Sequence, residues 1–153
     1  NSNMNNDIEW MEIALNEANN AYLENEVPIG AVIIRNDKLI AKAHNQPIAL
    51  NDPTAHAEIQ VIKKAGAIEK NYRLLNTTLY VTLEPCLMCL GAIIHARIDR
   101  IVYGASDSKN GVCGSINDLS KELFFNHQLQ ISKGVKENEC KKILKDFFEV
   151  RRV

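Results

Sequence analysis

The stretch from residue 78 to residue 97, TLYVTLEPCLMCLGAIIHAR, changes from a strand pattern to a helix pattern at one proline. Its first six residues are rich in β-branched and aromatic side chains, which favour a pleated surface. Pro85 follows where a helix can begin, because the first helical residue needs no backbone N–H. RIVYGA at 100–105 is a further strand-like run. A strand, helix and strand in this order constrain the fold to a sheet with helices on its faces.

Other periodic patterns extend this alternation along the chain. The predicted elements are a helix at about 7–24, a hairpin of GAVIIR and KLIAKA around Asn36-Asp37, a loop at 44–53, a helix at about 55–69 with Asp52 or Thr54 as N-cap, a helix at 86–97, a loop at 105–118, a strand within 128–135, and a last helix striped by Cys140, Ile143, Leu144, Phe147 and Phe148. This order predicts an α/β fold with one mixed five-stranded sheet. We expect a single domain over 7–153, a disordered segment at 1–6, and NSN before Met4 as a cloning remnant.

Length and composition fit one soluble globular domain. The chain has 153 residues, of which 46% are hydrophobic and 24% charged. A formal net charge of −1 neither indicates nucleic-acid binding nor excludes a local basic patch. The N-terminus lacks the basic region and long apolar run of a secretory signal, and the longest apolar run, IGAVII at 29–34, is too short to span a bilayer. We therefore expect a cytoplasmic protein without a membrane segment.

Two of the four cysteines are spaced for metal binding. Cys86 and Cys89 are three residues apart in the first turn of a predicted helix, so both sulfurs lie on one side and can reach one ion. The exposed N–H groups of that turn favour thiolate, which is the form that binds metal. Two cysteines are too few for a closed structural zinc site. The third ligand must be a histidine or a carboxylate, because Cys113 and Cys140 are isolated and are interpreted as ordinary thiols.

Among the four histidines, His56 has the context of a ligand. It opens the predicted helix after a proline-containing loop, and Glu58 stands two residues on. His44, His95 and His127 are interpreted as structural or surface residues. The combination H-x-E followed by P-C-x-x-C is the signature of zinc-dependent nucleobase deaminases.

A common site for His56 and Glu58 requires a local departure from the helix. Residues two apart inside a regular helix point to nearly opposite sides. If His56 lies at the helix edge, its ring can turn to the metal while Glu58 projects into the same pocket. Two thiolates and one imidazole would then hold Zn²⁺ with the fourth position open for water, and Glu58 would be free to carry protons. A redox CxxC or a non-catalytic zinc knuckle with a solvated Glu58 is the alternative interpretation.

Longer strings resemble a known family over nearly the whole chain, from Ile8 to Arg152. EVPIGAV, NDPTAHAEI, NYRLLNTTLYVTLEPCLMCLGAIIHARIDRIVYGASDSKNG and FFEVRR resemble the bacterial tRNA-specific adenosine deaminases, which convert wobble adenosine to inosine. H-x-E and PCxxC alone specify only the wider cytidine deaminase-like superfamily. The longer strings narrow the resemblance to the tRNA branch.

The resemblance implies a three-layer α/β/α fold, a homodimer and a tRNA anticodon stem-loop as partner. It also implies one Zn²⁺ per chain held by His56, Cys86 and Cys89, with proton transfer by Glu58. One rival hypothesis is a deaminase of a free base or nucleotide such as guanine, cytosine or deoxycytidylate. Another is a zinc-stabilised RNA-binding module without activity.

The same resemblance implies residues around the base. Asn45 would hydrogen-bond the flipped base, since an amide can donate to and accept from an adenine edge at once. Val27, Pro28 and Leu83 would form the walls of the base pocket. The alternatives are that Asn45 stabilises its own loop and that the three apolar residues belong to the ordinary core.

Contacts to the rest of the RNA are implied at two places. Asp107 would lie near the sugar of a neighbouring nucleotide, where a carboxylate can accept from a 2′-OH. Arg151 and Arg152 would hold phosphates, and Phe148 would stack on an unpaired base. The alternatives are a turn-capping aspartate, a charged helix end, and phenylalanines in the core.

Overall fold

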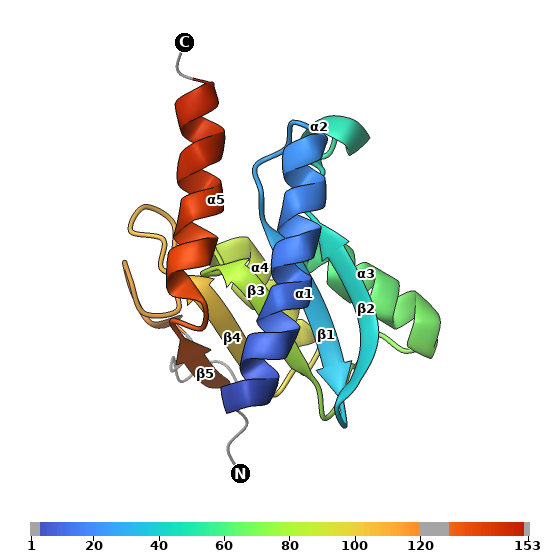
Figure 1. Cartoon of the computed structure of the whole chain (residues 1–153). Coiled ribbons are helices and arrows are strands. Elements are labelled where there is room, and N and C mark those ends of the chain that lie inside the picture. Colours follow the sequence, from blue (N-terminus) through green and yellow to red (C-terminus); the bar gives the residue numbers. More distant parts are fainter. Residues whose placement is uncertain (1–3, 120–128, 152–153) are drawn as a thin grey trace.

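A computed structural model gives the fold (Figure 1) and describes residues 4–119 and 129–151. The strands are β1 Gly30–Arg35, β2 Lys38–His44, β3 Thr78–Leu83, β4 Arg100–Ala105 and β5 Gln130–Lys133. They form one sheet in the order β2-β1-β3-β4-β5. β1 is antiparallel to β2 and to β3, whereas β3, β4 and β5 run parallel. The predicted mixed five-stranded sheet is therefore confirmed.

Helices cover both faces of the sheet. They are α1 Met4–Leu23, α2 Pro47–Leu50, α3 Ala57–Glu69, α4 Leu87–His95 and α5 Glu137–Val150. α1 and α5 pack on one face, and α3 and α4 on the other (Figure 1). The three-layer α/β/α architecture is confirmed. The four longer helices each bury part of their surface against the rest of the fold. None of the helices in the described ranges is long and apolar enough to cross a membrane.

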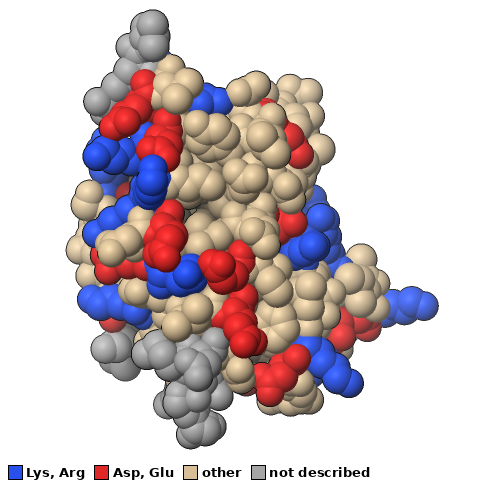
Figure 2. Space-filling model, viewed as in Figure 1, with Lys and Arg blue, Asp and Glu red and all other residues tan. Residues whose placement is uncertain are grey.

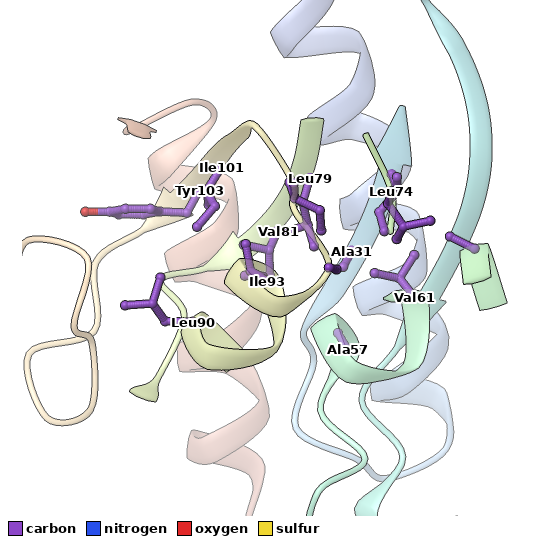
Figure 3. Packing of buried hydrophobic residues seen from close by; sticks show 14 of the residues in the cluster. Ala31, Ala57, Val61, Leu74, Leu79, Val81, Leu90, Ile93, Ile101 and Tyr103 are labelled. Atoms are coloured by element: carbon purple, nitrogen blue, oxygen red, sulfur yellow. The ribbon is translucent and has the colours of Figure 1, made fainter. Parts of the chain in front are cut away.

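The core lies in two layers, one on each side of the sheet. The layer under α3 and α4 contains Val61, Leu79, Leu90, Ile93 and Ile101, all fully buried. Figure 3 shows these side chains pointing toward one another from both helices and the strands. The layer under α1 and α5 is smaller and includes Met11, Val32, Val102 and Cys140. Burial on both faces explains why the central strands read as continuous apolar runs.

Two local features of the sheet follow from the sequence. Asn36 and Asp37 both have positive φ angles, 52° and 59°, and this is the backbone conformation that a two-residue hairpin turn requires. Gly30 lies directly under α1, and a Cβ there would stand 2.0 Å from the carbonyl oxygen of Ala14. Only glycine therefore allows α1 to approach β1 this closely.

α1 begins at Met4, within the segment 1–6 that we expected to be disordered. Asp7 explains why the helix start is fixed, because this buried carboxylate binds two strands. It accepts from the Tyr80 hydroxyl at 2.6 Å and from both terminal nitrogens of Arg100 at 3.1 and 2.8 Å. The sequence alone could not show contacts to strands more than seventy residues away.

Replacing Asp7 by Asn is expected to lower the free energy of unfolding by about 2–4 kcal/mol, because it leaves the partly buried Arg100 guanidinium without its counter-charge. Urea titration followed by circular dichroism measures the change. Glu9→Gln, an exposed carboxylate on the same helix, is the matched control. An equal change in the two variants would show that the Asp7 contacts do not stabilise the fold.

The remaining departures are at element ends and in one loop. β5 occupies only part of the expected strand at 128–135, and α4 ends before residue 97. The expected loop at 44–53 contains the short helix α2. Its backbone N–H groups at Ile48 and Ala49 donate to the buried Glu26 carboxylate at 3.1 and 2.7 Å. Glu26 precedes β1 and β2 in the chain, 22 residues before Ile48. The sequence around α2 therefore did not indicate the helix.

Candidate metal centre and active site

Two helix N-termini on the same face of the sheet position the predicted ligands. His56 is the N-cap of α3, with extended backbone angles φ −69° and ψ 156°. Cys86 is the N-cap of α4, also extended, and Cys89 lies within the first turn, fully buried. His56 is therefore at the helix edge, as the sequence argument required, and the opposite-sides rule for residues two apart does not apply to it.

The three predicted ligand side chains converge. The Nδ1 atom of His56 lies 3.7 Å from the Cys86 sulfur and 3.5 Å from the Cys89 sulfur. All three candidate ligand atoms lie within 4.8 Å of one another. Two sulfurs and one imidazole nitrogen are ligands that zinc prefers, and three protein ligands are the number found in catalytic zinc sites.

The other histidines lie elsewhere. His44 bridges two glutamates, one in α1 and one directly after it, with Nδ1 3.1 Å from Glu17 and Nε2 3.0 Å from Glu24. His95 is exposed at the last residue of α4, and His127 lies outside the described residues. The structural interpretation of His44 is thus confirmed by two charge-assisted contacts.

The pKa values of the two thiols are shifted in opposite directions. Hydrogen bonds from Cys89 and from the His56 ring lower the pKa of Cys86 to about 4. The hydrogen bond to the Cys86 sulfur, together with burial, raises the pKa of Cys89. The sulfur pair thus holds one negative charge on its own. A bound dication would let both thiols ionise, so the donor set and its charge fit Zn²⁺.

Glu58 lies in the first turn of α3, two residues from the metal-facing histidine. Its side chain is 4% exposed, and burial raises its pKa to about 7. Cys89 is a hydrogen-bond neighbour of the carboxyl group, so Glu58 projects toward the sulfur pair. The group of converging ligand atoms does not include it. A buried carboxyl group with a pKa near neutrality, beside a metal site but not in it, can both accept and release a proton.

Asn45 holds the start of α3. Its Oδ1 atom accepts from the backbone N–H of Ala57, the first helical residue, at 2.9 Å. The prediction of Asp52 or Thr54 as N-cap was wrong, because Asp52 accepts from the N–H and hydroxyl of Thr54 and closes the preceding turn instead. The Asn45 side chain thus fixes the backbone on which His56 and Glu58 stand.

A pocket of about 460 Å³ lies at the end of β3 and gathers four of the predicted substrate residues. Its lining residues are Val27, Ile29, Leu83, Ser106, Asp107, Ser108, Lys109, Asn110, Leu144 and Phe148. The metal-facing side chains are not part of this lining. Leu83 links the two, because it ends β3 three residues before Cys86.

Pro28 and Arg151 are placed differently, and Asp107 has a second role. Pro28 is buried and does not line the pocket. Arg151 covers the Phe147 ring, with Cζ 3.5 Å from the ring centroid, and donates to Asn25 at 2.7 Å. Asp107 accepts from two backbone N–H groups of its own turn, so it is a turn cap as well as a pocket residue. Arg152 lies outside the described residues.

The α5 stripe divides between core and pocket. Phe147 is 4% exposed and packs on Tyr22, whereas Phe148 is 47% exposed and lines the pocket. Cys140 is fully buried and Cys113 nearly so, and both are free thiols, as expected. A 3.6-residue period places neighbouring phenylalanines on one broad face and cannot show which of them reaches the pocket.

Sequence reasoning missed Glu84, which is 3% exposed and lies between β3 and Cys86. Its carboxylate accepts from the backbone N–H groups of Asp107, Cys113 and Ser115. The available indication was a charged residue next to Pro85 at the end of an apolar strand. Its partners lie more than twenty residues on, in a loop without periodicity.

Comparisons with known proteins agree with this geometry. Residues 5–152 match the family model described as MafB19-like deaminase. The tRNA-specific adenosine deaminase of Buchnera aphidicola is 49% identical, over 97% of this chain and 97% of the relative. A solved structure from studies of A-to-I editing by tRNA deaminases at the wobble position superposes with a TM-score of 0.86 at 44% identity, covering 89% of this chain and 99% of the other. A guanine deaminase from Bacillus subtilis superposes less well, with a TM-score of 0.61 at 38% identity over 64% of this chain and 63% of that one. The chain belongs to the family of tRNA-specific adenosine deaminases.

Proposed function

We propose that this protein hydrolyses wobble adenosine to inosine in a tRNA anticodon. The observation that carries the proposal is the convergence of His56, Cys86 and Cys89 beside a buried Glu58 that is not among the ligand atoms. The relatives named above for tRNA-specific adenosine deamination extend over nearly the full chain, which supports RNA as the substrate.

We assign one Zn²⁺ to the three ligand side chains. When bound there, zinc supplies a Lewis acid that lowers the pKa of a water molecule toward neutrality. His56 and Cys89 are held by helix starts that pack against the sheet, so the ligand geometry is fixed before substrate arrives.

Glu58 carries the protons of the reaction. Its carboxylate takes a proton from the attacking water and passes it to the ring nitrogen next to the carbon that bears the amino group. Oxygen bonds to that carbon as a hydroxyl group. Glu58 then takes the remaining proton of this hydroxyl and gives it to the amino group, so the carbon–nitrogen bond breaks, ammonia leaves and the carbonyl of inosine forms. A pKa near 7 suits a group that must bind and release protons in turn.

Asn45 is assigned to the base. Its Oδ1 atom is engaged by Ala57, and no described residue accepts from its Nδ2 group. Nδ2 can therefore donate to a ring nitrogen of the extruded adenine. The loop-stabilising role that we considered as the alternative is also real, so one side chain would serve both purposes.

Asn45→Asp is expected to separate these two roles. Aspartate keeps an acceptor for the Ala57 N–H and remains a good cap, so the thermal midpoint should stay near that of the native protein. The donor is lost, and kcat/KM on RNA should fall by about 10²-fold. Thermal melting and steady-state kinetics measure the two effects. Asn45→Ala, which loses both roles, is the comparison, and full activity of the Asp variant would exclude the base contact.

The wall of the base pocket and the nearest RNA contacts are assigned to the pocket that Leu83 lines. Val27 and Leu83 offer apolar surface for the extruded base, Phe148 can stack on an unpaired base, and Asp107 retains one carboxylate oxygen that can accept from a 2′-OH. Pro28 is assigned to the buried backing of this wall. Phosphate contacts are assigned to Arg151, which directly follows α5, and to Arg152.

The outer face of α5 does not add a positive surface. Lys141, Lys142 and Lys145 each lie within 4 Å of a carboxylate one turn away. Figure 2 shows blue and red atoms alternating over this side of the molecule. Affinity for RNA should therefore depend on the pocket and the helix end more than on α5 as a whole.

Incubation with four substrates tests the proposal against its rivals. The purified protein is given an arginine-type anticodon stem-loop RNA, free guanine, cytidine and adenosine, and the products are analysed by mass spectrometry. Inosine at the wobble position only, with the free compounds unchanged, is the expected result. Turnover of a free base or nucleoside with intact RNA would support the free-base hypothesis, and no turnover at all would support a binding module.

We further infer a homodimer that acts in the cytoplasm on tRNA. Family membership supports this assembly. Size-exclusion chromatography with light scattering tests it, with twice the chain mass as the expected result. A monomer at micromolar concentration would contradict the inference.

A further inference from the structure

Glu84 connects the metal centre to the wall of the pocket. It follows β3 directly and stands two residues before Cys86. Its Oε1 atom accepts from the Asp107 N–H at 3.0 Å and from the Ser115 hydroxyl, and its Oε2 atom accepts from the N–H groups of Cys113 at 2.9 Å and Ser115 at 3.0 Å. One carboxylate thus binds both ends of the loop that contributes half of the pocket lining.

Backbone contacts reinforce the same connection. The Glu84 N–H donates to the carbonyl of Ala105 at 2.9 Å, and the Val112 N–H donates to the carbonyl of Pro85 at 3.2 Å. Gly111 lies against the carboxylate, where a Cβ would stand 2.3 Å from the Glu84 Cδ atom. The loop is therefore folded tightly around this side chain, and glycine at 111 is required for the approach.

The groups of Asp107, Cys113 and Ser115 that surround the Glu84 oxygens suit a carboxylate. All four groups that face the Glu84 oxygens are donors, and an ionised carboxylate is the side chain that only accepts. A glutamine of the same shape would turn an NH₂ group toward two of these donors. At least one backbone N–H would lose its acceptor: the Asp107 N–H if the NH₂ group takes the Oε1 position, where the Ser115 hydroxyl can turn to accept, or the Cys113 and Ser115 N–H groups if it takes the Oε2 position.

We propose that Glu84 is a positioning residue that sets the distance of the RNA-binding wall, residues 106–110, from the metal centre. It does not touch the reacting atoms. It acts through Asp107, whose backbone it holds, and through the loop that carries Ser108, Lys109 and Asn110. The inference rests on the proposed function, because RNA is the ligand that the wall would contact.

Glu84→Gln tests the proposal with three readouts. Amide hydrogen exchange at Asp107, Cys113 and Ser115 should become at least about tenfold faster. The dissociation constant for the anticodon stem-loop, measured by fluorescence anisotropy, should rise at least about tenfold. Metal content should stay at one ion per chain, and kcat at saturating RNA should change less than KM does.

Asp7→Asn is the matched control. It also perturbs a buried carboxylate, but one that binds Tyr80 and Arg100 rather than the loop. Measured at a temperature where both variants are folded, it should leave RNA affinity unchanged. Glu84→Asp, which keeps the carboxylate, should recover part of the affinity. Equal RNA affinity in Glu84→Gln and the native protein, or equal loss in Asp7→Asn, would overturn the proposal.

These outcomes are distinct from a failure of the proposed function. If the native protein does not bind or deaminate RNA, the proposed function is wrong. Hydrogen exchange would then still show whether Glu84 holds the loop. If the native protein deaminates RNA and the exchange rates in Glu84→Gln are unchanged, only the positioning role is wrong.

Discussion

Replacing Glu58 by Gln is expected to lower kcat on an anticodon stem-loop by at least about 10³-fold while the protein keeps its metal and its affinity for the RNA. Gln keeps the shape of the side chain but cannot move a proton. The site would still bind the metal, because the converging ligand atoms do not include Glu58. Single-turnover assays measure the rate, and metal analysis measures the occupancy.

The control for this variant is Glu69→Gln. Glu69 is a carboxylate on the same helix that pairs with Arg35 at 2.6 Å, far along α3 from its N-terminus. It should retain native kcat. If Glu58→Gln lost its metal together with its activity, Glu58 would be a ligand and not a proton carrier.

Removal of the metal is the second large effect that we expect. A chelator should abolish deamination, and added Zn²⁺ should restore it, because water alone is too weak a nucleophile at neutral pH. The apo protein should also unfold at lower temperature, since the buried sulfur of Cys89 would lose the metal ion that it binds. Cys86→Ser and Cys89→Ser should give the same loss without a chelator.

Cys113→Ser separates a metal effect from general thiol chemistry. Its sulfur is buried but lies outside the group of converging ligand atoms. This variant should keep one metal ion per chain and near-native kcat. Native metal content in Cys89→Ser would show that the metal binds elsewhere.

The sequence was sufficient where a local pattern determines the geometry. The three-residue spacing of Cys86 and Cys89 after Pro85 indicated one face of a helix start, and the structure places both there. The pairing of His56 with Glu58 was interpretable for the same reason, because a helix edge follows from a proline-containing loop. Periodicity also predicted all the long helices and every strand of the sheet.

The sequence was insufficient where a buried polar group chooses a distant partner. Asn45 replaced the two local N-cap candidates because its side chain reaches α3 across the loop. Glu26 and Glu84 each bind backbone N–H groups more than twenty residues away. Nothing in the local periodicity around these residues encodes such contacts, and only the folded chain brings donor and acceptor together.

The placement of Phe148 shows a related limit. Phe147 and Phe148 are neighbours with the same side chain, and both fit the apolar stripe of α5. Packing against Tyr22 takes Phe147 into the core and leaves Phe148 at the pocket. Small differences in the rotation of a helix decide this, and they depend on the whole layer beneath it.

The most direct test of the central claim is an anomalous difference map at the zinc absorption edge, recorded from crystals of the zinc-loaded protein. We predict a single strong peak within bonding distance of His56 Nδ1 and of the sulfurs of Cys86 and Cys89. Water should be the fourth ligand, and the Glu58 carboxylate should lie outside bonding distance. A peak at another place, a histidine ring turned away from the sulfurs, or a fourth protein atom on the metal would contradict this account of the site.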